Sequence, residues 1–209
     1  MTLEEAIAKI KPLDHNAMEI AQKRWDSIAK PLHSLGKLET LLIQIAGITG
    51  NAEVDLSRRG LIVMCADNGV VKEGVTQTGQ EVTAIVAENF LKYDTSVGVM
   101  CKQNHAEIFP VDMGMVTDTK VRTDHKIAYG TQNMTKGPAM TREQAVKGLE
   151  AGIDMVRELN DKGYRILATG EMGIGNTTTS SAVASVLLKQ PVEEMTGRGA
   201  GLTSEGLVR

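Results

Sequence analysis

The sequence predicts an α/β protein, with a Rossmann-like parallel sheet covered by helices on both faces and a small helical subdomain preceding it. In residues 1–55, apolar residues recur only at helical spacings. From Gly60 onward, short apolar runs that end in glycine turns alternate with helical patterns, and such alternation is typical of a covered parallel sheet. We therefore expect a helical subdomain or dimer arm over residues 1–55 and an α/β nucleotide-binding core over residues 56–209.

Three helices are expected before residue 55. Thr2 and Glu5 form a capping box ahead of the first helix, and Asp14 can cap the second. The second helix carries one apolar face, formed by Ala17, Ala21, Trp25 and Ile28. The third covers "KLETLLIQIAGITG", with two glycines near its end.

Three strands are expected in the core. They are "GLIVMCAD" (residues 60–67), "AEIFPVDMG" (106–114) and "YRILATG" (164–170), since short apolar runs are typical of buried parallel strands. Two helices, "EVTAIVAENFL" and "SVGVMCKQ", are predicted between the first two strands. A longer helix follows a capping box of Thr141 and Gln144, and its expected apolar face is Ala145, Leu149, Ile153, Val156 and Leu159.

The composition limits the kinds of partner. The 209 residues carry a net charge of -3 and only 3% aromatic residues, which disfavours nucleic-acid binding. No apolar run approaches the ~20 residues of a membrane span, and the N-terminus lacks the apolar stretch of a signal peptide. Cys65 and Cys101 show no paired spacing, so we expect reduced thiols in a cytoplasmic protein. The histidines show no metal-ligand spacing, so no metal site is expected.

The stretch "TGEMGIGNTTTSSAVASVLL" begins inside the third strand. Residues 170–179 are expected to form a glycine-rich turn, and "SSAVASVLL" to continue as a helix. A helix N-terminus exposes unpaired N–H groups, glycines let an anion approach them, and Asn176 and Thr177 add donors. The pattern predicts a phosphate or carboxylate site, with a purely structural turn as the alternative. It is not a Walker A loop, because no lysine follows the last glycine.

Two further features lie at the edge of the sheet where ligands bind to parallel strands. Glu171 is expected inside the glycine-rich turn, as a functional acid or as a solvated loop residue. The loop "ADNGVVKEGVTQTG" follows the first strand. It forms either the polar rim of a site or a merely structural loop, and its candidate rim residues are Asp67, Glu73, Thr76, Gln77 and Thr78.

These motifs resemble those of the nicotinate-nucleotide–dimethylbenzimidazole phosphoribosyltransferase family. The matching motifs span nearly the whole chain and include "RWDSIAKPLHSLGKLE", "VDMGM", "GTQNMTKGPAMT", "GEMGIGNTTT" and "GRGAG". The resemblance implies phosphoribosyl transfer from nicotinate mononucleotide to 5,6-dimethylbenzimidazole, which gives α-ribazole 5′-phosphate and nicotinate in cobalamin lower-ligand synthesis. It implies two small-molecule substrates, no cofactor and no metal, and a homodimer.

The resemblance also implies roles for single residues. It assigns the 5′-phosphate to Gly173, Ile174, Gly175, Asn176 and Thr177. Glu171 is implied to lie near the nucleotide and is the one catalytic candidate. The base pocket is implied at Asp67, Thr78 and Val86.

Members of this family are usually longer than this sequence. The resemblance places their proposed base, a glutamate, in a segment beyond Arg209, together with further strands, so we expect a sheet that is incomplete at the C-terminus. Two functions are therefore open. One is the phosphoribosyltransferase, and the other is a truncated, non-catalytic module that binds a nucleotide or a benzimidazole. Turnover distinguishes the two.

Overall fold

The chain divides into two compact units, Thr2–Arg58 and Arg59–Arg209, the second including Met1. The computed structural model describes residues 1–201 and 203–207. In this part of the chain, no helix is both long enough and apolar enough to cross a membrane. Whether the first unit serves as a subdomain or as a dimer arm stays a prediction.

The unit Thr2–Arg58 contains α1 (Leu3–Ala8), α2 (His15–Ser27) and α3 (Lys37–Thr49). The predicted capping box of Thr2 and Glu5 is confirmed, and so is the cap of α2, where Asp14 accepts from the backbone N–H of Ala17 at 3.0 Å. Ile28 departs from the expected face of α2. The backbone becomes extended at this residue, with ψ at 138°, so its side chain leaves the helical face and is exposed.

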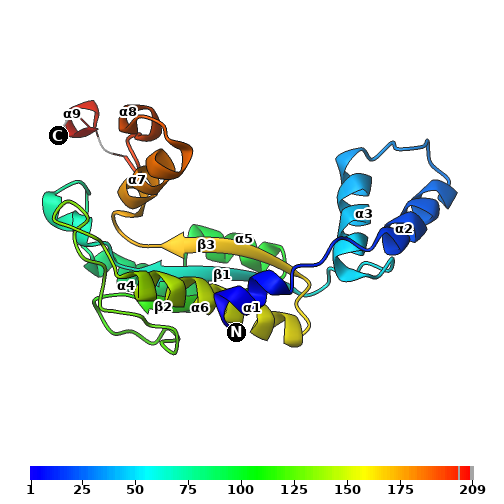
Figure 1. The fold of residues 1–209 in the computed structure, drawn as a ribbon, viewed down its shortest axis with the longest axis horizontal. Helices are drawn as coiled ribbons and strands as arrows, with labels where there is room; N and C mark the ends of the chain where they lie inside the picture. Colours follow the sequence, from blue (N-terminus) through cyan, green and yellow to red (C-terminus); the bar gives the residue numbers. More distant parts are fainter. Residues whose placement is uncertain (202, 208–209) are drawn as a thin grey trace. The chain divides into compact units, whose positions relative to one another are not determined.

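The unit Arg59–Arg209 is built on a parallel sheet of β1 (Arg59–Ala66), β2 (Ala106–Gly114) and β3 (Ile166–Met172). The strand order is β2-β1-β3, with β1 in the centre (Figure 1). The predicted α/β class and parallel sheet are confirmed. The accompanying helices are η1 (Gly69–Glu73), α4 (Glu81–Lys92), α5 (Ser96–Gln103), α6 (Arg142–Asp161), α7 (Asn176–Leu188), α8 (Val192–Met195) and α9 (Ser204–Leu207).

Helices pack against both faces of β1. Leu61, Val63 and Cys65 alternate along the strand and belong to a core that includes residues of α4 and α5. Ile62 faces the other way and belongs to a second core with Leu159 of α6. Because side chains of a strand alternate between its faces, one short apolar run supplies both cores.

The predicted apolar face of α6 is only partly right. The capping box of Thr141 and Gln144 is present, and Leu159 is fully buried. Leu149 and Val156, however, are 56% and 47% exposed. The buried face lies to one side of the expected one and is formed by Ala151, Met155 and Leu159. The apolar residues of this helix spread over more than one face. Their spacing therefore does not decide which face packs against the sheet.

The third strand and the following helix are shifted from their predicted positions. The strand runs to Met172, because β1 continues to pair with it up to Cys65. Tyr164, expected in the strand, packs edge-to-face against Phe109 in the core, with ring centroids 5.2 Å apart. The helix α7 begins at Asn176 rather than at residue 180. The turn between them is therefore only residues 173–175.

The edge strand β3 and the helix α7 carry much exposed apolar surface. Within the described residues, β3 pairs with β1 alone, and the sheet is open. Val186 and Leu187 of α7 are 77% and 75% exposed. In the second half of α7, from Ala182 to Leu188, apolar residues lie on all sides of the helix, which is typical of a helix segment that other elements cover.

Candidate functional site

A cavity of about 550 Å³ lies where β1 and β3 end at the carboxyl edge of the sheet. Three segments form most of its lining, namely residues 75–78, residues 172–178 and residues 196–201, and Ser181 and Gly206 complete it. All three belong to the unit Arg59–Arg209. The cavity thus occupies the edge at which parallel α/β sheets bind their ligands.

The glycine turn forms one wall of this cavity. Gly175 precedes α7 in the left-handed conformation, with φ at 85°, which favours glycine. A Cβ atom on Gly173 would lie 2.1 Å from the carbonyl oxygen of Ala66, so only glycine lets the turn approach β1 this closely. The start of α7 thereby reaches the cavity with its partial positive charge directed outward.

Two side chains from other segments hold this turn. The N–H of Ile174 donates to Oγ1 of Thr83 at 3.0 Å, and the carbonyl of Ile174 accepts from Nδ2 of Asn68 at 3.0 Å. Oγ1 of Thr179 lies 3.3 Å from Oδ1 of Asn68 and 2.9 Å from the carbonyl oxygen of Asn176, which is its nearer acceptor. Sequence reasoning assigned no site role to Asn68 or Thr83. The sequence signals for Asn68 were its position directly after a buried strand and its turn pair with Gly69.

Glu171 lies at the end of β3 and not inside the turn, contrary to the sequence prediction. Successive strand residues face opposite sides of a sheet, and Met172 lines the cavity whereas Glu171 does not. The carboxylate is nevertheless connected to the cavity wall. Nδ2 of Asn176 donates to both of its oxygens, at 2.5 and 2.6 Å, and Asn176 lines the cavity.

The three residues expected in the base pocket lie in different surroundings. Thr78 lines the cavity. Asp67 is fully buried at the end of β1, where its Oδ2 accepts from the N–H of Val116 at 2.8 Å. Val86 packs on the core formed by α4 and α5. Of the three, the structure brings only Thr78 to the cavity surface.

Glu73, a predicted rim residue, binds the loop that follows β2. Its Oε1 accepts hydrogen bonds from Nδ2 of Asn133 and, at 3.1 Å, from Oγ1 of Thr135, and Nζ of Lys136 lies 3.5 Å away. The bond from Asn133 is the largest cause that lowers the pKa of Glu73, followed by that from Thr135. The ionised carboxylate thus holds this loop against η1.

Arg198 is a cation at the cavity that sequence reasoning did not single out. It lines the cavity, and its Nη2 donates to Oγ of Ser204 at 2.8 Å. In the described part of the chain, no carboxylate forms an ion pair with it. The backbone beside it is close to the glycine turn, because a Cβ atom on Gly199 would lie 2.8 Å from Oγ1 of Thr177. The motif "GRGAG" was its only signal in the sequence.

Residues 196–201 also contact the third wall of the cavity. Nε2 of Gln77 donates to the carbonyl of Gly201, so the segment touches the loop after β1 as well as the start of α7. The cavity therefore has one wall of backbone N–H groups, one wall of polar loop residues and an arginine between them. An anionic group with a polar extension fits this arrangement.

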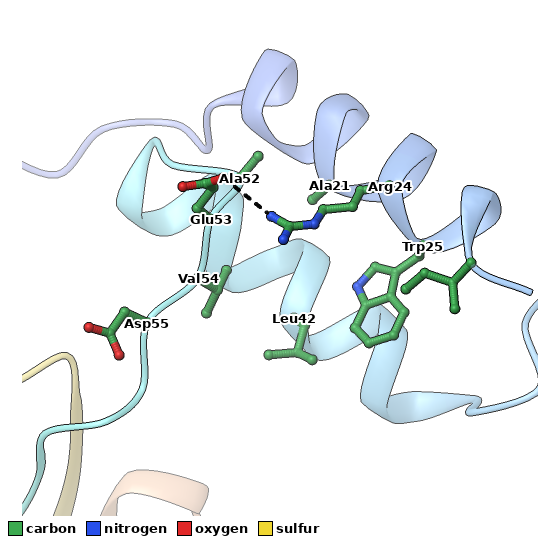
Figure 2. Close-up of a pocket in the computed structure, with 9 residues that line it drawn as sticks. Ala21, Arg24, Trp25, Leu42, Ala52, Glu53, Val54 and Asp55 are labelled. Carbon is green, nitrogen blue, oxygen red and sulfur yellow. Dashed lines mark ion pairs between the residues drawn. The ribbon is translucent and has the colours of Figure 1, made fainter.

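A second cavity, of about 530 Å³, lies within the unit Thr2–Arg58. Figure 2 shows Arg24 and Trp25 of α2 and Leu42 of α3 at this cavity, with the segment of residues 52–55 beside them. The charged pair of Arg24 and Glu53, 3.6 Å apart, is exposed. No glycine turn or helix start borders this cavity, so it lacks the donors of the first.

The chain is similar to known proteins over nearly its whole length. A family model described as phosphoribosyltransferase matches residues 10–209. The nicotinate-nucleotide–dimethylbenzimidazole phosphoribosyltransferase of Ruminiclostridium cellulolyticum is 50% identical over 210 residues, which cover 100% of this chain and 60% of the relative. The protein of the same name from Clostridium acetobutylicum is 49% identical, over 98% of this chain and 59% of the relative.

The fold of the chain is also similar to that of a solved structure. The crystal structure of CobT from Thermus thermophilus superimposes with a TM-score of 0.83 at 36% identity, covering 92% of this chain and 59% of that protein. The chain thus spans about 60% of the length of the relatives that it matches.

Proposed function

Because the chain belongs to the phosphoribosyltransferase family, we propose that the protein transfers a phosphoribosyl group from nicotinate mononucleotide to 5,6-dimethylbenzimidazole. The bond between ribose C1′ and the nicotinate nitrogen breaks, and a bond from C1′ to a benzimidazole nitrogen forms. The other ring nitrogen of the benzimidazole loses its proton. The products are nicotinate and α-ribazole 5′-phosphate, and the reaction needs no cofactor or metal.

The glycine turn at the start of α7 carries this proposal. The 5′-phosphate would be bound at Gly173, Ile174, Gly175, Asn176 and Thr177. The N–H of Ile174 already donates to Thr83, so its part is to hold the turn rather than to donate to the phosphate. The N–H of Asn176 likewise donates to the carbonyl of Gly173 at 3.0 Å. The N–H groups of Gly175 and Thr177 would supply the donors, and the helix adds its partial positive charge.

Arg198 would supply the formal charge that a phosphate monoester requires. It lines the same cavity without a carboxylate partner in the described chain. A guanidinium can donate two parallel hydrogen bonds to a phosphate. A glycine turn and an arginine on two walls of one cavity fit a dianion better than the turn alone.

The benzimidazole would lie against the loop after β1, whose residues 75–78 form another part of the cavity lining. Thr78 borders the cavity there. Asp67 is buried and Val86 is partly buried against the core, so both would act only on the shape of the pocket. Glu171 would act through Asn176, which it orients. Holding both reactants face to face provides much of the rate increase in such a substitution, and a nearby carboxylate favours the positive charge that develops on the ribose.

We propose a cytoplasmic homodimer as the working form of the protein. The helices of the unit Thr2–Arg58 expose several large apolar side chains, among them Leu38, Leu41 and Ile48 of α3. Exposed apolar side chains gathered on one small unit are typical of an interaction surface. Sedimentation at several concentrations tests the dimer.

The proposed reaction is tested by incubating the protein with nicotinate mononucleotide and 5,6-dimethylbenzimidazole. We expect α-ribazole 5′-phosphate and nicotinate to form in equal amounts. Binding of the nucleotide without either product would favour the non-catalytic binding module instead. A protein that neither binds nor converts the nucleotide would contradict both functions.

A further inference from the structure

Asn68 connects the end of β1 to the glycine turn with both functional groups of its side chain. Nδ2 donates to the carbonyl of Ile174 at 3.0 Å, and Oδ1 lies 3.3 Å from Oγ1 of Thr179, whose single hydroxyl hydrogen also has the carbonyl of Asn176 within reach, at 2.9 Å. The backbone carbonyl of Asn68 accepts in turn from Nε2 of Gln80 at 3.2 Å. The bond to Ile174 orients this half-buried amide, because a flip of the amide would place its oxygen, an acceptor, against the carbonyl oxygen of Ile174.

The turn packs directly on Asn68. A Cβ atom on Gly173 would lie 3.0 Å from Nδ2 of Asn68, and one on Gly175 would lie 3.4 Å from its Cβ. On the other side, the N–H of Ile174 donates to the fully buried Thr83. Side chains from two other segments therefore orient both peptide groups of Ile174.

The orientation of the Ile174 carbonyl sets the direction of the next N–H group. In a trans peptide, the C=O and the following N–H point in opposite directions. Because the Ile174 carbonyl points at Asn68, the N–H of Gly175 points away from Asn68. Gly175 lines the cavity, and its N–H has no acceptor among the residues that the structure describes.

We propose that Asn68 is a positioning residue that directs the N–H of Gly175 at the 5′-phosphate of the nucleotide. This inference rests on the proposed function of the glycine turn. Asn68 does not touch the phosphate itself. Asn68 aligns the N–H of Gly175 before the ligand binds. The free-energy cost of ordering the turn on binding is therefore lower.

The test compares binding of nicotinate mononucleotide and of nicotinate riboside, which lacks the phosphate, by calorimetry. In Asn68→Ala, we expect the Kd of the mononucleotide to rise about tenfold, because one hydrogen bond to a charged group is lost or misaligned. The Kd of the riboside should stay within about twofold, since it makes no use of the turn. The unfolding temperatures of Asn68→Ala and of the wild-type protein are measured first, and they should be equal.

Two further variants separate positioning from a general loss of stability. A neutral histidine offers one donor and one acceptor, so Asn68→His should restore most of the mononucleotide affinity. Asn104→Ala is the matched control, because Nδ2 of Asn104 also donates to a backbone carbonyl, that of Met100, at 2.9 Å. It lies outside the cavity and should leave the Kd of both ligands unchanged.

The outcomes are distinct. If Asn68→Ala folds and binds the mononucleotide as tightly as the unchanged chain, the positioning role is wrong while the proposed function stands. If it loses affinity for the riboside by the same factor, Asn68 has only a structural role. If the unchanged chain binds neither the mononucleotide nor ribose 5-phosphate, the proposed function fails, and the positioning role fails with it.

Discussion

The amide of Asn176 donates to both carboxylate oxygens of Glu171 across the glycine turn that separates the two residues. Asn176 opens α7 and Glu171 is near the end of β3, so the pair joins the two elements that flank the turn. Charge-assisted hydrogen bonds of this kind are stronger than neutral ones. The relationship gives Glu171 a role in orienting a residue of the cavity wall, although Glu171 itself does not line the cavity.

Glu171→Gln should therefore weaken nucleotide binding through Asn176. A glutamine side chain has only one acceptor oxygen, so it retains at most one of the two bonds. We expect a Kd for nicotinate mononucleotide about 3- to 10-fold higher, because Glu171 acts on the ligand only through Asn176 and the loss is then that of an ordinary hydrogen bond. Calorimetry on Glu171→Gln, Asn176→Ala and the double variant measures this. Effects of the two changes that simply add would contradict the coupling.

Gly175→Ala should strain the turn that the phosphate is proposed to occupy. The left-handed φ of 85° disfavours any side chain, and a Cβ atom would lie 3.1 Å from Cγ2 of Val71. We expect a loss of about 1–2 kcal/mol in unfolding free energy and at least tenfold weaker binding of nicotinate mononucleotide. The control is Gly152→Ala, in the middle of α6, where a Cβ atom meets nothing within 4 Å. Equal nucleotide binding in Gly175→Ala would show that the phosphate lies elsewhere.

Arg198→Met should weaken phosphate binding and reduce its salt dependence. Removing the guanidinium removes a formal charge from the cavity, so we expect the Kd of ribose 5-phosphate to rise about tenfold. The Kd of Arg198→Lys should lie between that of the wild-type protein and that of Arg198→Met. The control is Arg157→Met, since Arg157 is half exposed on α6 and pairs with Asp154. Binding measured from low to high salt checks the prediction, and a Kd unchanged in Arg198→Met would contradict it.

Most of the fold could be predicted from local signals along the chain. The capping boxes at Thr2 and Thr141 depend on residues three apart, and the buried strands depend on short apolar runs, so both could be found without tertiary information. The end of β3 could not. Glu171 and Met172 extend the strand because they pair with β1, and pairing between distant segments leaves no periodic signal in either one.

The candidate site was predictable only in part for the same reason. The glycine turn could be found because its glycines and polar residues are contiguous. Asn68 and Thr83 are distant from it in the sequence and reach it only through the fold. Arg198 stands between glycines in a segment without regular structure, where no pattern distinguishes a cavity residue from an exposed one.

Glu73→Gln should release the loop around Asn133 in a pH-dependent way. The pKa of Glu73 lies below its ordinary value of 4.5, chiefly because Asn133 donates to the carboxylate. A lowered pKa in the folded state means that the stabilisation is fully present above about 4.5 and is lost as the pH falls through the lower folded value. The unfolding temperature of Glu73→Gln should therefore lie below that of the unchanged protein at pH 7, and the difference should shrink as the pH falls below 4.5, as measured at pH 3.

The control for this effect is Glu193→Gln, an exposed glutamate of α8 that forms no ion pair in the described residues. It should follow the unchanged protein at both pH values. A difference between Glu73→Gln and the unchanged protein that persists undiminished at pH 3 would mean that the ionised carboxylate is not what holds the loop.

The most direct measurement is a crystal structure of the protein soaked with nicotinate mononucleotide. We predict that the 5′-phosphate lies in the cavity, within hydrogen-bonding distance of the N–H of Gly175 and the first residues of α7, with the guanidinium of Arg198 on its other side. The ribose would then extend toward the loop of residues 75–78. A nucleotide bound with its phosphate away from the glycine turn, at full occupancy and in every copy, would contradict the assignment of this cavity as the phosphoribosyl site.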